Sequence, residues 1–295
     1  MMEELRGSET AARARWAAAL LGSAVVLIAG HPYTIFYEGA GAGVLRAIAI
    51  ALLIIGGLVA AVGLAVAVPL LADAVRSPKP VVFLLVVACV LVMVVLGVIM
   101  IIPYGNLAVL MVLGGSQLAY VEPGAPAAPR TARVRVALPF SLAMLALLSV
   151  GMLHSTVWNP AAQVPGLSLA EIHGRLDEDG PTIGSIMIGW SLFWGLLVLA
   201  FPVFCRFART PVVATTRRVV LAGLLLVAMV GYGQTILGFA MGLGLGETFE
   251  LATVGDAVPG GAIVVIVAQF AVVAALFVGC PAWRPRLEPV PAGGP

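Results

Sequence analysis

The residues best suited to chemistry in this 295-residue sequence are two histidines that stand at the ends of long apolar runs. His31 is followed closely by Tyr33, Thr34 and Glu38, and His154 begins a second polar group. Histidine gains and loses a proton near neutral pH, and a neighbouring carboxylate can orient its ring. The histidines are therefore candidates for a general base, with Glu38 as a partner for His31.

A third polar group lies in a later apolar run. Thr156 accompanies His154, and Tyr232, Gln234 and Thr235 form the later group. The same residue types are common where helices leave a membrane, because tyrosine and tryptophan favour the interface and small hydroxyls bond to helix carbonyls. A binding site or transport pathway is the alternative, since polar groups at membrane depth usually face a bundle interior.

The elements that must position these groups are membrane-spanning helices. Apolar residues make up 61% of the chain and charged residues only 10%, against roughly 25% charged in soluble domains. A run of about 20 apolar residues is long enough to cross a bilayer as a helix, which satisfies its own backbone hydrogen bonds. The sequence thus predicts an all-α, polytopic transmembrane bundle, with eight spans at 16–37, 44–72, 81–102, 105–121, 137–158, 183–205, 219–243 and 260–280.

The fourth predicted span is the least regular. Residues 81–121 are too long for one straight helix, at about 61 Å for a hydrocarbon core of about 30 Å. The turn residues Pro103, Tyr104, Gly105 and Asn106 divide them. Residues 103–121 then form either a short span or a re-entrant segment, which makes seven spans plus that segment the alternative.

The basic residues predict the orientation. Lysine and arginine are retained on the cytoplasmic side during insertion. With the amino terminus inside, all 16 of them except Arg46 and Arg175 fall on that side. We therefore expect a multi-pass protein of the cytoplasmic (inner) membrane with both termini in the cytoplasm. Residues 1–15 form a cytoplasmic segment, 16–280 one transmembrane domain and 281–295 a disordered cytoplasmic tail.

This orientation brings the three polar groups to a similar depth. Counted from the cytoplasmic start of each span, His31, His154 and Gln234 lie about 22, 26 and 22 Å up, in the outer third of the membrane. His31 and His154 also hold matching places in the two halves of the chain, as do Tyr104 and Tyr232. A weak four-plus-four internal repeat would explain both matches.

The longest outer loop contains a helix-start pattern. Ser168 and Glu171 have the spacing of a capping box, and Leu169, Ile172 and Leu176 follow with helical spacing. The sequence predicts a short helix lying flat on the outer surface, either as an ordinary interfacial helix or as a lid that carries Glu171 and His173. These two residues are too far apart around a helix to share a metal ion.

No motif points to a cofactor, a metal site or nucleic acid. Two histidines could bind a metal or a heme, but the four histidines of a two-heme bundle are absent. The three cysteines, Cys89, Cys205 and Cys280, stand in apolar runs or at cytoplasmic ends, so no disulfide framework is indicated. The basic residues are scattered, without the aromatic interleaving of a nucleic-acid surface.

The expected partners are the lipid bilayer and a small molecule, ion or lipid. Small residues also recur every four positions at Gly57, Ala61 and Ala65, and at Gly238, Gly242 and Gly246. Such stripes let helices approach closely, so a homo- or hetero-oligomer could form through them.

Three functions fit the sequence. The leading one is a transporter, permease or channel-like protein with a polar site opening to the outer face. The first alternative is a membrane enzyme acting on a lipid or isoprenoid-like substrate near the outer leaflet, with His31 or His154 as the base and Glu38 or Glu171 as its partner. The second is an accessory or assembly subunit of a membrane complex.

Overall fold

The computed structural model describes residues 2–29, 41–76, 110–119, 126–178, 183–251 and 256–280, which form helices and contain no strand. The predicted span 81–102 and the turn before residue 110 lie outside these ranges. The elements are α1 (Met2–Ala29), α3 (Ala42–Arg76), the π-helix η1 (Leu110–Gly114), α6 (Gly115–Ala119), α7 (Arg130–Leu153), the π-helix η2 (His154–Trp158), α8 (Asn159–Gln163), α9 (Leu169–Glu178), α10 (Ile183–Phe207), the 3₁₀-helix η3 (Pro211–Val213), α11 (Thr216–Thr248) and α12 (Gly260–Gly279).

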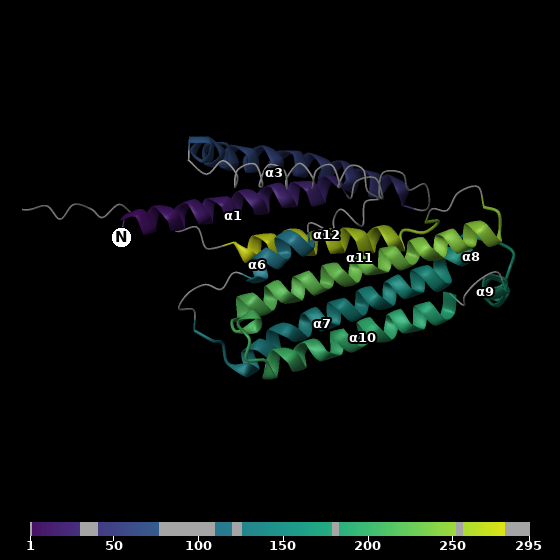
Figure 1. Cartoon of the computed structure of the whole chain (residues 1–295). Coiled ribbons are helices and arrows are strands. Elements are labelled where there is room, and N and C mark those ends of the chain that lie inside the picture. The colour runs from purple at the N-terminus through teal and green to yellow at the C-terminus, as the bar shows by residue number, and fades with distance from the viewer. Residues whose placement is uncertain are drawn as a thin grey trace, which may run out of the picture.

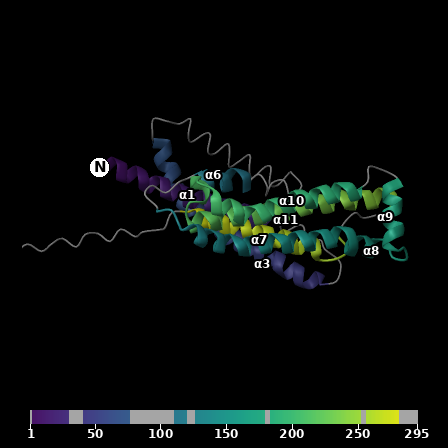
Figure 2. The same ribbon diagram turned by 90° about the horizontal axis from the view of Figure 1, so that it is seen from below.

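The long helices run side by side in a bundle (Figures 1 and 2). α11 packs against α7 and α12, α10 packs against α7, and α12 in turn contacts α1. α3 packs along α1 and forms the outer layer on that side (Figure 1). The short helix α9 lies across one end of the bundle, which we call the α9 end (Figure 2). Helix α11 therefore forms the centre of the described part of the molecule.

Six of the described helical segments are long and apolar enough to cross a membrane. They are Thr10–Ile28, Ala42–Leu70, Arg130–Gln163, Ser185–Phe207, Thr216–Thr248 and Gly260–Gly279. This confirms an all-helical bundle with several apolar helices, while the count of eight spans stays a prediction. α11, with 33 residues, is about 50 Å long and extends beyond a hydrocarbon core of about 30 Å.

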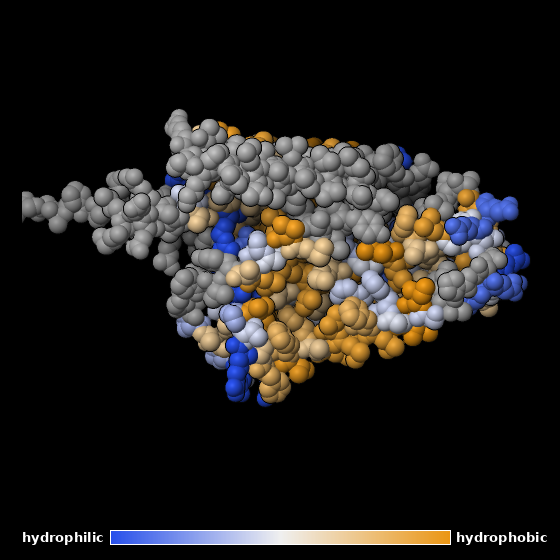
Figure 3. Space-filling model, viewed as in Figure 1, coloured by the Kyte–Doolittle hydropathy of each residue, from blue (hydrophilic) through white to orange (hydrophobic). Residues whose placement is uncertain are grey.

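The surface of the bundle has the polarity that a bilayer requires. Hydrophobic residues cover the middle of the described surface, and hydrophilic ones gather toward its two ends (Figure 3). Large apolar side chains on the outside of the helices are widely exposed, such as Leu58 at 65% and Leu196 at 68%. In water such exposure would oppose folding, but in lipid tails it costs nothing.

Glycines set the spacing between the helices. A β-carbon built on Gly231 of α11 would lie 2.7 Å from the β-carbon of Ala268 on α12. On α3, Gly56 and Gly63 face α1 in the same way, with neighbouring side-chain atoms at 2.8 and 3.0 Å. The predicted stripe that begins at Gly57 lies on another face of α3, where its three residues are exposed.

The end of the bundle opposite α9 is held by arginines, and we call it the arginine end. Arg133 donates from Nη1 to the carbonyls of Ala208 and Val213, at 3.0 and 3.2 Å, just beyond the last turn of α10. Two further arginines bond to carbonyls at the ends of other helices, namely Arg217 to Val278 and Cys280 and Arg218 to Leu118. Helix carboxyl termini carry carbonyls without partners inside the helix, so a guanidinium satisfies them and complements the helix dipole.

Candidate functional site

The site begins with a change of helix type at the α9 end of α7. α7 continues from Leu153 into the π-helix η2, whose first residue is His154. The backbone N–H of Asn159 bonds to the carbonyl of His154, five residues earlier, rather than to a residue four earlier. This wider turn brings the side chains of His154 and Asn159 to the same side of the helix, and such π-turns often mark functional positions.

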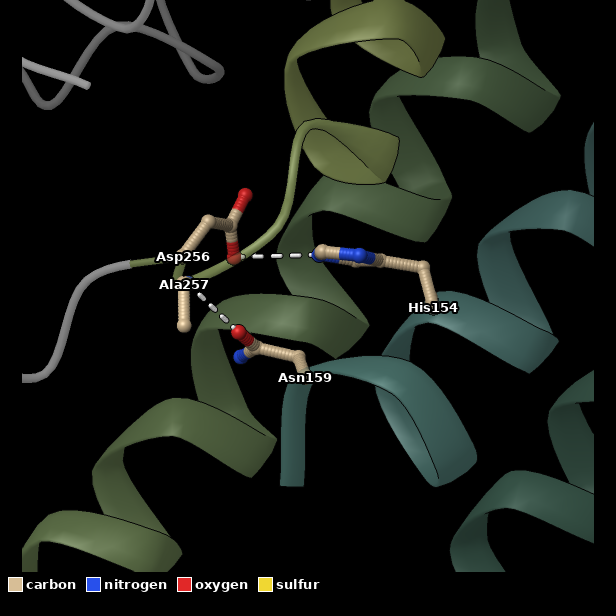
Figure 4. A network of polar contacts seen from close by, with 4 residues as sticks. All are labelled: His154, Asn159, Asp256 and Ala257. Carbon is tan, nitrogen blue, oxygen red and sulfur yellow. Dashed lines mark hydrogen bonds and ion pairs between the residues drawn. The ribbon is translucent and has the colours of Figure 1, made fainter. Parts of the chain in front are cut away.

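His154 pairs with a carboxylate from the loop that precedes α12. Its Nε2 atom lies 3.1 Å from Oδ1 of Asp256 (Figure 4). The histidine side chain is only 4% exposed, whereas that of Asp256 is 30% exposed. The pair therefore connects the surface at the α9 end with the interior of the bundle.

A second contact holds the same loop. The Oδ1 atom of Asn159 accepts a hydrogen bond of 2.8 Å from the backbone N–H of Ala257 (Figure 4). Because Asp256 and Ala257 are adjacent, His154 of η2 and Asn159 of α8 both bind one short segment. This segment leads directly into α12, whose first residues carry free N–H groups that favour a nearby negative charge such as the Asp256 carboxylate.

The His154 ring packs on the start of α12. A β-carbon on Gly260 would lie 2.7 Å from Nδ1 of His154, and one on Gly261 would lie 3.0 Å from its Nε2. The two successive glycines therefore leave room for the His154 ring and the Asp256 carboxylate beside the start of α12. Nδ1 is buried and has no hydrogen-bond partner among the described residues.

Gln234 and Ser155 continue the polar layer away from the surface. Gln234 of α11 is buried against Gly151 of α7, where an added β-carbon would lie 2.7 Å from its Oε1. The hydroxyl of Ser155 lies 3.4 Å from the β-carbon position of Gly238. Neither amide atom of Gln234 nor the hydroxyl of Ser155 has a partner in the described part of the chain.

Two tryptophans of α10 lie at the level of Gln234, and the sequence patterns did not predict them as site residues. Trp190 lies 2.7 Å from the β-carbon position of Gly233 on α11, next to Gln234, and its ring meets that of Trp194 edge-on at 5.8 Å. Within the described residues both indole N–H groups are buried without a partner. Their signal in the sequence is the spacing of four residues, which places both rings on one face of α10.

The structure separates other predicted site residues from this layer. Tyr232 is fully buried, but at two residues from Gln234 it lies about 200° around α11, away from α7. Thr235 and Thr156 each bond to a carbonyl of their own helix, those of Gly231 and Met152. The remaining predicted residues, His31, Tyr33, Thr34 and Glu38, lie outside the described residues.

Glu171 and His173, the two residues predicted to belong to a lid, both contact other groups in the structure. Glu171 accepts hydrogen bonds from the hydroxyl and backbone N–H of Ser168, at 2.7 and 2.8 Å, and these bonds lower the pKa of its carboxyl. It therefore caps α9 and does not face His154. His173 lies 2.9 Å from the Thr156 carbonyl through Nε2, which ties α9 to η2.

Among the described residues, the carboxylate beside His154 is that of Asp256. Glu171 caps α9, and Glu38 lies outside the described residues. Asp256 is about 100 positions from His154, and nothing local in the sequence links them. A histidine flanked by a carboxylate can hold, donate or accept a proton. The buried amide and hydroxyl nearby can donate and accept hydrogen bonds.

No known protein family model, curated protein or solved structure matches this chain. The arrangement of its own residues therefore carries the functional argument.

Proposed function

We propose that this chain is an integral membrane transport protein with a polar site that opens at the α9 end. The observation that carries the proposal is the layer formed by His154, Ser155, Trp190, Trp194 and Gln234. These side chains have buried polar atoms without partners among the described residues, and they meet at one level of the bundle. The layer reaches solvent through Asp256.

The energetic cost of this layer supports a functional role. Each buried donor or acceptor without a partner costs about 1–3 kcal/mol, and an apolar side chain of similar shape would avoid that cost. Gln234 and Ser155 lie among helices whose interfaces form a large hydrophobic cluster. Polar side chains that persist at membrane depth commonly line a pathway or a binding site.

The orientation follows from the arginine end. Arg133, Arg217 and Arg218 gather there, and basic residues remain on the cytoplasmic side of a membrane protein. We infer that the α9 end faces outward and that the polar site opens to the outside of the cytoplasmic membrane.

A thiol-labelling experiment tests this proposal. In a background with Cys89, Cys205 and Cys280 replaced by serine, Gln234→Cys and Ser155→Cys are introduced singly. A membrane-impermeant thiol reagent added outside intact cells should label both variants, because the pathway admits water from that side.

The matched control is Ile188→Cys, on α10 close to Trp190. The Ile188 side chain is 64% exposed and points away from the helix bundle. In a bilayer this position meets lipid, so it should stay unlabelled. Equal absence of label at Gln234→Cys, Ser155→Cys and Ile188→Cys would contradict the proposal.

A membrane enzyme acting on a lipid near the outer leaflet is the second candidate, and the contact of 3.1 Å between His154 and Asp256 favours it. There Asp256 would orient the ring while the other ring nitrogen removes a proton from the substrate. Lipid extracts from cells expressing the wild type and His154→Gln discriminate the two functions. The enzyme predicts a product that depends on His154, whereas transport leaves the lipid composition unchanged.

A further inference from the structure

An apolar groove lies near the arginine end of the bundle, separate from the polar layer. It is formed by η1, α6, α10, η3 and α11, and the twelve described residues that line it are apolar side chains or glycine. Its volume is about 350 Å³, within the range of about 300–1,000 Å³ that is usual for ligand sites. Such a lining offers a polar solute no side-chain hydrogen bond, so the groove fits a hydrocarbon chain.

The groove has a buried floor and exposed walls. Its floor is formed by Ala222 and Leu225 of α11, which are 8% and 6% exposed. Its walls include Met111 of η1 and Phe204 of α10, which are 61% and 46% exposed. The groove is therefore open to the outside of the described bundle, where a bilayer places its lipid tails.

The groove runs along the helices. On α11 it extends from Ala222 to Met229, a helix length of about 10 Å. Ala222 lies about 9 Å from Thr216, the first residue of that helix at the arginine end. Half of a hydrocarbon core is about 15 Å thick, so the groove begins within the leaflet at the arginine end and reaches toward the bilayer centre. The acyl chains of that leaflet occupy the same depth and run in the same direction.

The mouth of the groove is positively charged. Two guanidinium groups bond to the carbonyls of residues that line it, Arg218 to Leu118 and Arg133 to Val213. Arg209 is exposed in the turn that joins α10 to η3. Among the side chains that the structure describes, the carboxylates belong to α9, to the end of α11 and to the residues between α11 and α12, all at the α9 end. The mouth therefore attracts an anion.

We propose that the groove binds an anionic glycerophospholipid from the leaflet at the arginine end. One acyl chain lies along Ala222 and Leu225, and the phosphate lies at the mouth, beside the exposed guanidinium of Arg209. This site is independent of the proposed transport site, which lies near the opposite end of the bundle.

Charge, rather than the acyl chain, selects the lipid at this site. Lipid tails are as apolar as the groove, so a chain that moves from the bilayer into it gains little beyond packing contacts. An arginine near the membrane surface, in contrast, strengthens the binding of an anionic headgroup about fivefold. A choline headgroup gains less, because its own positive charge compensates the phosphate.

Photo-crosslinking tests the proposal with the purified full-length protein in phosphatidylcholine vesicles. A small fraction of the lipid is phosphatidylglycerol whose acyl chain carries a diazirine near its methyl end. After irradiation, peptide mass analysis should find the label on η1 and on α11 near Met229. With the diazirine close to the glycerol, the label should move to Leu118 and Val213. The same probes with a choline headgroup should label the groove about tenfold less.

A variant that fills the groove tests its occupancy. Gly115 lines the groove, and an added β-carbon there meets nothing within 4 Å, so Gly115→Leu extends into the space of the acyl chain without displacing protein atoms. Labelling of α11 near Met229 should fall to the level of the general lipid-facing surface. The matched control is Gly189→Leu, on the exposed surface of α10, where a β-carbon also meets nothing within 4 Å. It should leave the groove label unchanged.

A second variant tests the headgroup. Arg209→Gln removes the exposed charge at the mouth and should lower groove labelling by the phosphatidylglycerol probe about fivefold. Arg135→Gln removes another exposed arginine of the same end, on α7 outside the groove lining, and should leave the labelling unchanged.

Three results would overturn the inference. Label spread equally over the groove and exposed positions such as Leu58 of α3 would mean ordinary boundary lipid. Equal groove labelling by the choline probe, or an Arg209→Gln protein with wild-type labelling, would remove the selection by charge. A groove without label would be covered by another segment or by a second copy of the chain. Thiol labelling at Gln234→Cys depends on none of these results, so failure here leaves the transport function standing.

Discussion

The two ends of the bundle differ in how their buried polar side chains are bonded. At the arginine end, three guanidinium groups bond to carbonyls at the ends of other helices. In the polar layer near the α9 end, Gln234 and Ser155 are buried with no partner among the described residues. The first arrangement stabilises the fold, whereas each unpaired group of the second lowers the stability by about 1–3 kcal/mol. The comparison separates polar groups with a structural role from those on which the proposed function rests.

The largest expected effect is at the arginine end. Arg133→Met removes two charged hydrogen bonds and leaves the carbonyls of Ala208 and Val213 unpaired, so the free energy of unfolding should fall by about 3 kcal/mol. Unfolding by denaturant in detergent micelles measures this change. The control is Arg135→Met, two residues along α7 and exposed, which should change it by no more than about 0.5 kcal/mol. Equal effects would show that the carbonyl contacts contribute nothing.

Overpacking the polar layer should have the next largest effect. Gly151→Val places new methyl groups against Gln234, and the free energy of unfolding should fall by about 2 kcal/mol. Gly189→Val is the matched control, because a β-carbon at Gly189 meets nothing within 4 Å. If both valine variants were equally stable, the layer would be looser than the glycine contacts indicate.

Removing an unpaired polar group from the layer should instead increase the free energy of unfolding. Gln234→Met keeps the length of the side chain but removes an unpaired amide, so the free energy of unfolding should rise by about 1 kcal/mol. Gln269→Met is its control, since the Gln269 amide donates a hydrogen bond of 2.9 Å to the Val26 carbonyl across helices. That variant should instead lose about 0.6 kcal/mol. Destabilisation by both would mean that Gln234 has a structural partner.

The smallest effect concerns the cap of α9. The bonds from Ser168 lower the pKa of Glu171, so the ionised cap stabilises α9 at neutral pH and is lost as the pH falls through that lowered value. Amide hydrogen exchange in α9, corrected for its intrinsic pH dependence, should therefore quicken under acid conditions. Ser168→Ala removes the donor hydroxyl and should weaken this pH dependence. An α9 that is equally protected at all pH values would show that Ile172 and Leu176 hold it without the cap.

Much of the architecture could be predicted because its causes are local. Runs of apolar residues predict helices that cross a membrane, and six helices among the described residues are long and apolar enough to do so. The capping box at Ser168 and Glu171 was predictable because both partners lie within one helical turn. The polar groups around His154 and Gln234 were visible in the sequence, and α7 and α11 do pack against each other.

The composition of the site could not be predicted in the same way. Asp256 is one of several acidic residues outside the predicted apolar runs, and only the path of the chain into α12 brings it to His154. Tyr232 and Gln234 are two residues apart in sequence, yet α11 turns them to different neighbours. The tryptophans of α10 join the layer because Gly233 lets that helix approach.

The sequence by itself determined that this chain is a bundle of apolar helices with polar groups near helix ends, because hydrophobicity and helix capping act over one element at a time. The tertiary structure decided which polar groups meet. Glycine contacts set the distances between helices, and the π-turn orients His154 and Asn159 toward the same loop. These are relations between segments tens of residues to about 100 residues apart, and no local pattern in the chain encodes them.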